Sequence, residues 1–203
     1  TVSMDIDNAD KDNNPLTGAD ITFTDKGTLT IGRDMFGNKY TSITNNIYIF
    51  IKGKPFTSDS VTVTTGTNID GSVSNSVNGT HYDYDANGHI VNATSKIDID
   101  VTKLASDTLK QEISQIIASG GSDVSAYIQL NNNRLTMSAS ITVGYELAGV
   151  SNFKYTTVTT TTYEIIHGRP LAKKTTSVTT LIVEAQGSEP QRFTTTTVTT
   201  TLR

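Results

Sequence analysis

The chain has 203 residues, contains no cysteine or tryptophan, and carries a formal net charge of −4 with charges of both signs scattered along it. The lack of cysteine excludes disulfides and thiolate metal sites. The scattered charges argue against the clustered basic face that nucleic-acid binding needs, so no sequence-specific nucleic-acid partner is expected. No apolar run approaches the roughly 20 residues of a membrane-spanning helix, and no secretory signal is recognisable. The length suits one large all-β domain, or two small ones divided near residue 150.

The first third of the chain is predicted to form short antiparallel strands. Residues 1–7 alternate apolar and polar side chains, and a polar loop follows them. Residues 20–24 and 28–32 flank a short Gly-containing segment that is typical of a hairpin turn. Residues 46–53 form the most apolar run of the chain, and we expect this strand to lie in the core.

The middle of the chain is predicted to contain a loop, a hairpin and a further strand. Residues 66–79 are rich in Gly, Ser and Asn, which is typical of a long exposed loop or of a poorly packed segment at a sheet edge. Asn87-Gly88 lies between short alternating runs and predicts a hairpin with a type I′ turn. Residues 95–102 alternate strictly, with Ile97, Ile99 and Val101 on one face and Asp98 and Asp100 on the other.

One helix is predicted, at about residues 104–119. Its apolar side chains recur at helical spacing and form a single stripe, which suits a helix that covers one face of a sheet. The stripe consists of Leu109, Ile113, Ile116 and Ile117. Gly120-Gly121 ends the helix, and strands are expected again at residues 126–130 and 134–147.

The last fifty residues carry a Thr-rich repeat. Three β-branched runs are centred on Val158, Val178 and Val198, twenty residues apart, with Gly and Pro between them. Such runs predict strands, so residues 154–203 are expected to form a three-strand antiparallel meander that extends as an assembly arm. The predicted fold class is all-β: an antiparallel sandwich or barrel with one helix, in a single domain of residues 1–203.

The final run, residues 193–202, has no charge and no proline. Monomeric proteins normally protect an edge strand with charges or prolines, so an unprotected terminal strand predicts a partner. We expect a homo-oligomer held by β-strand pairing, and the alternative is a monomer whose last strand pairs within its own sheet. The predicted interface residues are Phe193, Thr195, Thr197, Val198, Thr199 and Leu202.

Two acidic loops are candidates for calcium, although neither completes an EF-hand loop; the alternative for both is a solvated Asx-rich turn. The first offers Asp5, Asp7, Asp10 and Asp12, and the second offers Asp83, Asp85 and Asn87. Apart from calcium, no cofactor is predicted. Around the second loop, the chain resembles a single YD repeat, the hairpin unit of Rhs-type shells, at Tyr82, Tyr84, Asp85, Gly88 and Ile90. This resemblance implies a hairpin and no activity.

No arrangement of residues predicts catalysis. The three histidines, His81, His89 and His167, lie in no recognisable catalytic motif, and a G-x-S-x-G elbow is absent from the sequence. Asp98 and Asp100 share a strand face, but a solvated face explains them better than a glycosidase pair does.

We therefore expect a non-enzymatic structural protein that assembles into a tube, fibre or shell. The leading hypothesis is a virion component that resembles a phage tail or tail tube in its architecture. The alternative is a secreted module of a surface filament or adhesin, extracellular or on the cell surface and stabilised by calcium.

Overall fold

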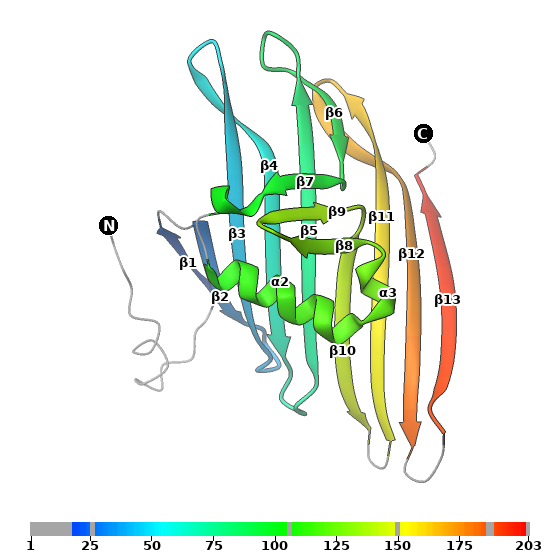
Figure 1. The fold of residues 1–203 in the computed structure, drawn as a ribbon. Helices are drawn as coiled ribbons and strands as arrows, with labels where there is room; N and C mark the ends of the chain where they lie inside the picture. The colour runs from blue at the N-terminus through cyan, green and yellow to red at the C-terminus, as the bar shows by residue number, and fades with distance from the viewer. Residues whose placement is uncertain (1–17, 25–26, 105–106, 149–150, 186–188, 202–203) are drawn as a thin grey trace.

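The computed structural model describes residues 18–24, 27–104, 107–148, 151–185 and 189–201 (Figure 1). The described strands form one ten-stranded sheet and one three-stranded sheet, and all of their pairings are antiparallel. The all-β fold class with one main helix, predicted from the sequence, is confirmed.

The large sheet has the strand order β1-β2-β3-β4-β5-β10-β11-β12-β13, and β6 joins β5 to β11 at one end. Its strands are β1 (Gly18–Thr24), β2 (Gly27–Arg33), β3 (Lys39–Ile51), β4 (Lys54–Thr67), β5 (Val73–Tyr84), β6 (Ile90–Thr94), β10 (Ser140–Ala148), β11 (Ser151–Ile166), β12 (Arg169–Ala185) and β13 (Gln191–Thr200). The small sheet has the order β7-β9-β8 and consists of β7 (Ile97–Asp100), β8 (Ile128–Asn131) and β9 (Arg134–Met137).

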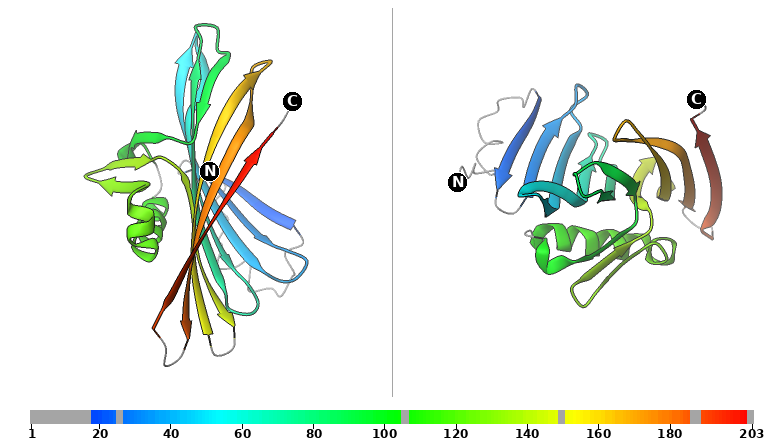
Figure 2. Two further views of the ribbon diagram at one scale, coloured as in Figure 1. Left: turned by 90° about the vertical axis from the view of Figure 1, so that its right-hand side faces the viewer. Right: turned by 90° about the horizontal axis from the view of Figure 1, so that it is seen from above.

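Helix α2 (Asp107–Gly120), the single turn α3 (Ser122–Ser125) and the 3-10 turn η1 (Val101–Lys103) connect β7 to β8. Together with the small sheet, they lie on one face of the large sheet, which is strongly twisted (Figure 2). The molecule therefore has two layers, and the large sheet has one covered face and one open face.

The core lies between α2, the small sheet and the covered face of the large sheet. The predicted apolar stripe of the helix is confirmed, because Leu109, Ile113 and Ile116 are fully buried and Ile117 packs at the edge of the same cluster. The large sheet contributes Val61, Val63, Val77, Ile141, Val143 and Val158. This cluster is small for a sheet of ten strands, and the composition of the open face explains why.

The open face carries hydroxyl side chains where a second core would need apolar ones. One row of directly paired residues crosses eight strands and contains only threonine and serine: Thr30, Ser42, Thr64, Ser76, Thr142, Thr157, Thr179 and Thr195. Paired hydroxyls on this face share hydrogen bonds, for example those of Thr44 and Thr62 (2.8 Å) in a neighbouring row. Such a face suits a β-sheet that remains in contact with water, because threonine favours strands and forms cross-strand pairs.

The prediction of a long loop at residues 66–79 is wrong. Asn68–Ser72 forms a tight turn in which the Gly71 N–H donates to the Asn68 carbonyl (3.0 Å), and β5 begins at Val73. Strand β5 lies in the middle of the large sheet, and Val77 is completely buried. The alternation of small polar residues with Val73 and Val77 reflects a strand with one open face rather than a loop.

The prediction that residues 46–53 lie in the core is also wrong. The β3–β4 hairpin extends past the covered region (Figure 1), and Tyr48 and Phe50 are 53% and 73% exposed. The register of β3 and β4 shifts between Ile47 and Tyr48, where the two strands leave the core. Apolar content alone does not distinguish a buried strand from a projecting one.

The C-terminal meander is confirmed and continues the large sheet through the pairing of β10 with β11. Val158 lies directly opposite Val178, as the twenty-residue repeat suggests. Val198, however, lies opposite Thr176, two residues away from Val178. The register of β13 on β12 is therefore shifted by two residues from the one that would place Val198 opposite Val178.

Candidate functional site

Strand β13 forms one edge of the large sheet (Figure 1). It pairs with β12 over all ten of its residues, and no other described strand pairs with it. Every residue from Gln191 to Thr200 is exposed, and Arg192 is the only charged one. The outer side of β13 therefore presents the alternating backbone N–H and C=O groups that another strand can bind.

The predicted interface residues lie on both faces of this edge. Phe193, Thr195, Thr197 and Thr199 alternate on the face that carries the hydroxyl rows, and Val198 points to the opposite face. Phe193 is 51% exposed and Val198 is 54% exposed, so both have apolar area that a partner strand would bury. Leu202 lies outside the described residues.

An ion pair fixes the start of β13 to the second layer. The Arg192 guanidinium contacts the Asp123 carboxylate on α3, and the next strands carry a second pair between Lys154 and Glu184 (2.8 Å). Exposed pairs of this kind contribute little to stability. The Arg192–Asp123 pair links the first residues of β13 to α3.

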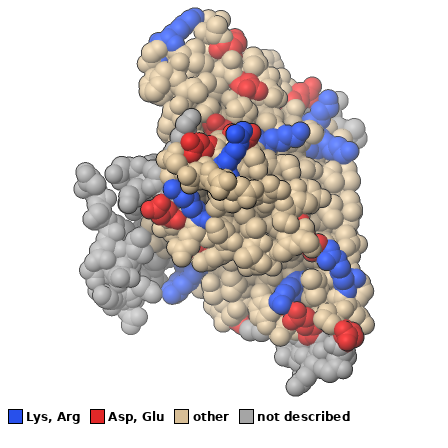
Figure 3. Space-filling model, viewed as in Figure 1, with Lys and Arg blue, Asp and Glu red and all other residues tan. Residues whose placement is uncertain are grey.

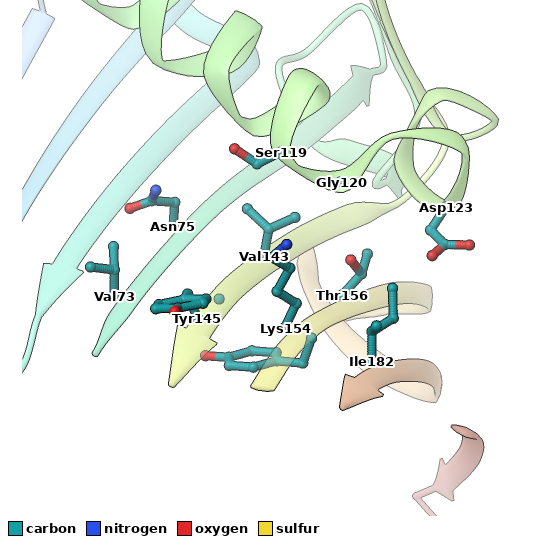
Figure 4. A pocket seen from close by; sticks show the side chains of 12 residues that line it. Val73, Asn75, Ser119, Gly120, Asp123, Val143, Tyr145, Lys154, Thr156 and Ile182 are labelled. Carbon is teal, nitrogen blue, oxygen red and sulfur yellow. The ribbon is translucent and has the colours of Figure 1, made fainter. Parts of the chain in front are cut away.

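A pocket of about 440 Å³ lies beneath the end of α2, against the covered face of β5, β10 and β11 (Figure 4). Its base is formed by Val73, Val143 and Ile182, and Ser119 lies above them. The buried Asn75 Oδ1 has no hydrogen-bond partner among the described residues, so it can accept a bond from water or a ligand. The lining contains one serine, one lysine and no histidine.

The second calcium candidate is a hydrogen-bonded hairpin turn. The Asn87 and His89 N–H groups donate to Asp85 Oδ1 (2.8 and 2.9 Å), and His89 Nδ1 lies 3.0 Å from Asp85 Oδ2. These bonds, led by the one from the His89 N–H, lower the pKa of Asp85 to about 2. Lys52 Nζ donates to Asn87 Oδ1 (2.6 Å). The turn is therefore held by hydrogen bonds between protein groups, and calcium binding at Asp83, Asp85 and Asn87 stays a prediction.

The turn also differs from the predicted type. A type I′ turn requires a positive φ at both central residues, but at Asn87-Gly88 only Gly88 has one (87°). The turn is closed instead by the bond from the Gly88 N–H to the Asp85 carbonyl (3.0 Å), so the loop is longer. The hairpin itself is confirmed by the pairing of β5 with β6.

Asp83 belongs to a separate cluster with His81. Nδ1 of His81 lies 2.7 Å from Asp59 Oδ1, and Nε2 lies 3.2 Å from Asp83 Oδ1. Partial burial lowers the pKa of His81, but the hydrogen bonds and charges of the two carboxylates outweigh this and raise it. The Asn92 amide donates to Asp83 Oδ2 (2.9 Å), and this bond, followed by the one from His81, lowers the pKa of Asp83.

Across the described residues, no group of three or more His, Cys, Asp and Glu side chains is arranged to hold a metal ion. Asp5, Asp7, Asp10 and Asp12, the first calcium candidates, lie outside the described residues. Asp98, which the sequence pairs with Asp100, is bound by Arg134 through two bonds of 2.5 and 2.6 Å.

Charged side chains of both signs are interspersed over the helix-bearing face (Figure 3). This face therefore lacks the concentrated positive potential of a nucleic-acid-binding surface. None of the described helices is long and apolar enough to span a membrane.

Comparisons with known proteins identify no relative. No protein-family model, no curated protein and no solved structure matches the chain.

Sequence reasoning missed one exposed edge, Asn46–Ile51 of β3. This segment has no charge and no proline, the same signal that identified residues 193–202. Its apolar side chains led instead to a prediction of burial, although the test for an unprotected edge applies to it equally well.

Proposed function

We propose that this protein is a non-enzymatic structural subunit that assembles by β-strand pairing, with β13 as a connecting edge. The observation that carries the proposal is the ten-residue strand β13, which is exposed throughout and uncharged from Phe193 to Thr200. Soluble monomers generally block such an edge with lysine, proline, a bulge or a covering loop. Here the strand is regular over all ten residues.

The free energy gained from backbone pairing alone is close to the free-energy cost of association. Two paired ten-residue strands form on the order of ten hydrogen bonds, each worth about 1 kcal/mol net. Association costs about 4–15 kcal/mol in lost freedom of motion. Burial of Phe193 and Val198, at about 25 cal/mol per Å² of apolar surface, then decides whether a stable contact forms. The assembly should accordingly be reversible and depend on concentration.

Whether the assembly is a virion component or a cell-surface filament stays a prediction made from the sequence. A virion tube and a cell-surface filament both need subunits that join through their edges. The proposal made from the structure concerns this shared property, a repeating contact through strand pairing.

The test places a charge on the outer part of β13. Val198→Lys changes a side chain that is 54% exposed, so the subunit should fold normally. Light scattering and electron microscopy should show assemblies of the wild-type chain that grow with concentration, and Val198→Lys should be monomeric. Gln115→Lys, on the exposed side of α2, adds the same charge elsewhere and should assemble like the wild type. A wild-type chain that remains monomeric at all concentrations would contradict the proposal.

A further inference from the structure

A second exposed edge lies on the opposite side of the sheet. The pairing of β2 with β3 covers Lys39–Thr44, and no described strand pairs with the outer side of Asn46–Ile51. Figure 1 shows this half of β3 rising beyond β2, in the hairpin that β3 forms with β4. Among the described strands, β1 and β13 are the two outermost strands of the large sheet, and this part of β3 is an additional stretch of edge that neither β1 nor β2 covers.

The side chains of this segment are apolar on both faces. Tyr48 and Phe50 point to one face and are 53% and 73% exposed, and Ile49 points to the other and is 39% exposed. The segment Asn46–Ile51 contains no charge and no proline. A β-prone, uncharged segment with exposed apolar side chains is the kind of edge that pairs with another chain.

We propose that Asn46–Ile51 is the acceptor for β13 of a second copy of this chain. The inference rests on the proposed function, and it names the partner of the β13 edge. Phe193–Thr200 of β13 and Asn46–Ile51 of β3 are both uncharged, so these segments do not oppose each other electrostatically. The ten residues of β13 are sufficient to cover the six of the acceptor. Pairing would also place the aromatic side chains of β3 opposite β-branched ones, which is a favourable combination across strands.

The outermost strand β1 carries a charge at Asp20, whereas pairing of β13 with β3 covers two uncharged segments with one repeated contact. If β13 paired with β13 of a second copy, the two-fold contact would close as a dimer and leave both β3 segments exposed. If β13 pairs with β3, each subunit donates one edge and accepts at another. Such a head-to-tail contact continues from subunit to subunit and produces a ring or an open polymer.

The test mixes two variants that are blocked at opposite edges. Val198→Lys blocks the donor and keeps the acceptor, whereas Phe50→Lys blocks the acceptor and keeps the donor. Phe50 is 73% exposed, so its replacement should leave the fold intact, and circular dichroism of each variant verifies this. Phe50→Thr provides a second variant without a new charge. We expect each Lys variant to be monomeric alone and an equimolar mixture to form a one-to-one heterodimer of twice the 21.8 kDa chain mass.

Native mass spectrometry, with one variant isotopically labelled, distinguishes the outcomes. A heterodimer in the mixture supports the inference, and so does weaker assembly of Phe50→Thr. If Phe50→Lys assembles like the wild type, the acceptor lies elsewhere and the inference is overturned. If Phe50→Lys alone forms a homodimer, β13 pairs with itself, which overturns the inference but keeps the proposed function. If Val198→Lys assembles like the wild type, the proposed function itself fails.

Discussion

A methyl group added at Gly79 should disrupt the contact between the two layers. Gly79 lies in the centre of β5 and is buried, and a Cβ there would lie 2.4 Å from Cγ1 of Ile97 on β7. Ile97 is itself only 2% exposed, so it cannot turn out into solvent without leaving the core. Overpacking of this kind costs about 1–3 kcal/mol. We expect Gly79→Ala to lower the free energy of unfolding by about 2 kcal/mol, and the Tm by about 4–8 °C.

A double-mutant cycle tests whether Ile97 is the cause. Ile97→Ala alone should cost about 2–5 kcal/mol because it leaves a cavity. In the double variant the new methyl group occupies part of that cavity, so the total loss should be smaller than the sum by about 1–2 kcal/mol. Urea denaturation of all four proteins, in the Val198→Lys background to avoid assembly, measures this difference.

Gly66→Ala on the neighbouring strand β4 is the matched control. A Cβ at Gly66 would lie 3.4 Å from the Ser74 carbonyl, which is ordinary contact, and its φ is not positive. We expect this variant to have unchanged or slightly higher stability. If Gly79→Ala is as stable as Gly66→Ala, or if the cycle with Ile97→Ala is additive, the small sheet does not pack over β5 as described.

Two further predictions concern pH, and urea midpoints across pH measure both. The pKa of His81 is raised above its unfolded value of about 6.5. Its contacts with Asp59 and Asp83 therefore stabilise the fold fully below pH 6.5, and this contribution is lost as the pH rises through the folded pKa. His81→Gln should remove this dependence of stability on pH. The pKa of Asp85 is lowered from 3.8 to about 2, so its contribution to stability is present above pH 3.8 and is lost as the pH falls through about 2. Asp85→Asn should reduce this loss of stability in acid. An unchanged loss would contradict the hydrogen bonding with His89.

Much of the fold could be predicted because periodicity is a local property. The stripe on α2, the alternation of β7 and the β-branched runs of β11, β12 and β13 each identify their element without tertiary information. Strand β5 was missed because its open face carries Ser74, Ser76 and Asn78, residue types that are also common in loops. Only its position between β4 and β10 makes it a central strand.

The candidate site was predicted in part for a related reason. The absence of charge identified β13 as an edge, because this signal is local. The exposure of Tyr48 and Phe50 depends on where the core ends along β3, and α2 and the small sheet, which lie far away in the sequence, determine that boundary. No pattern within residues 46–53 contains this information.

The hydroxyl-rich open face helps to direct association to the edges. If valine occupied the rows that contain Thr157 and Thr179, the open sheet would present a broad apolar surface, and two copies would stack face to face. Threonine keeps the strand preference of valine, and its hydroxyl forms bonds within the sheet, such as the one of 2.9 Å between these two residues. The hydroxyls of this face are then satisfied within the sheet, whereas no described strand pairs with the outer side of β13 or of Asn46–Ile51 on β3. With its 36 threonines the chain can form a wide sheet with a polar face, and the proposed assembly would then proceed through the strand edges rather than through this face.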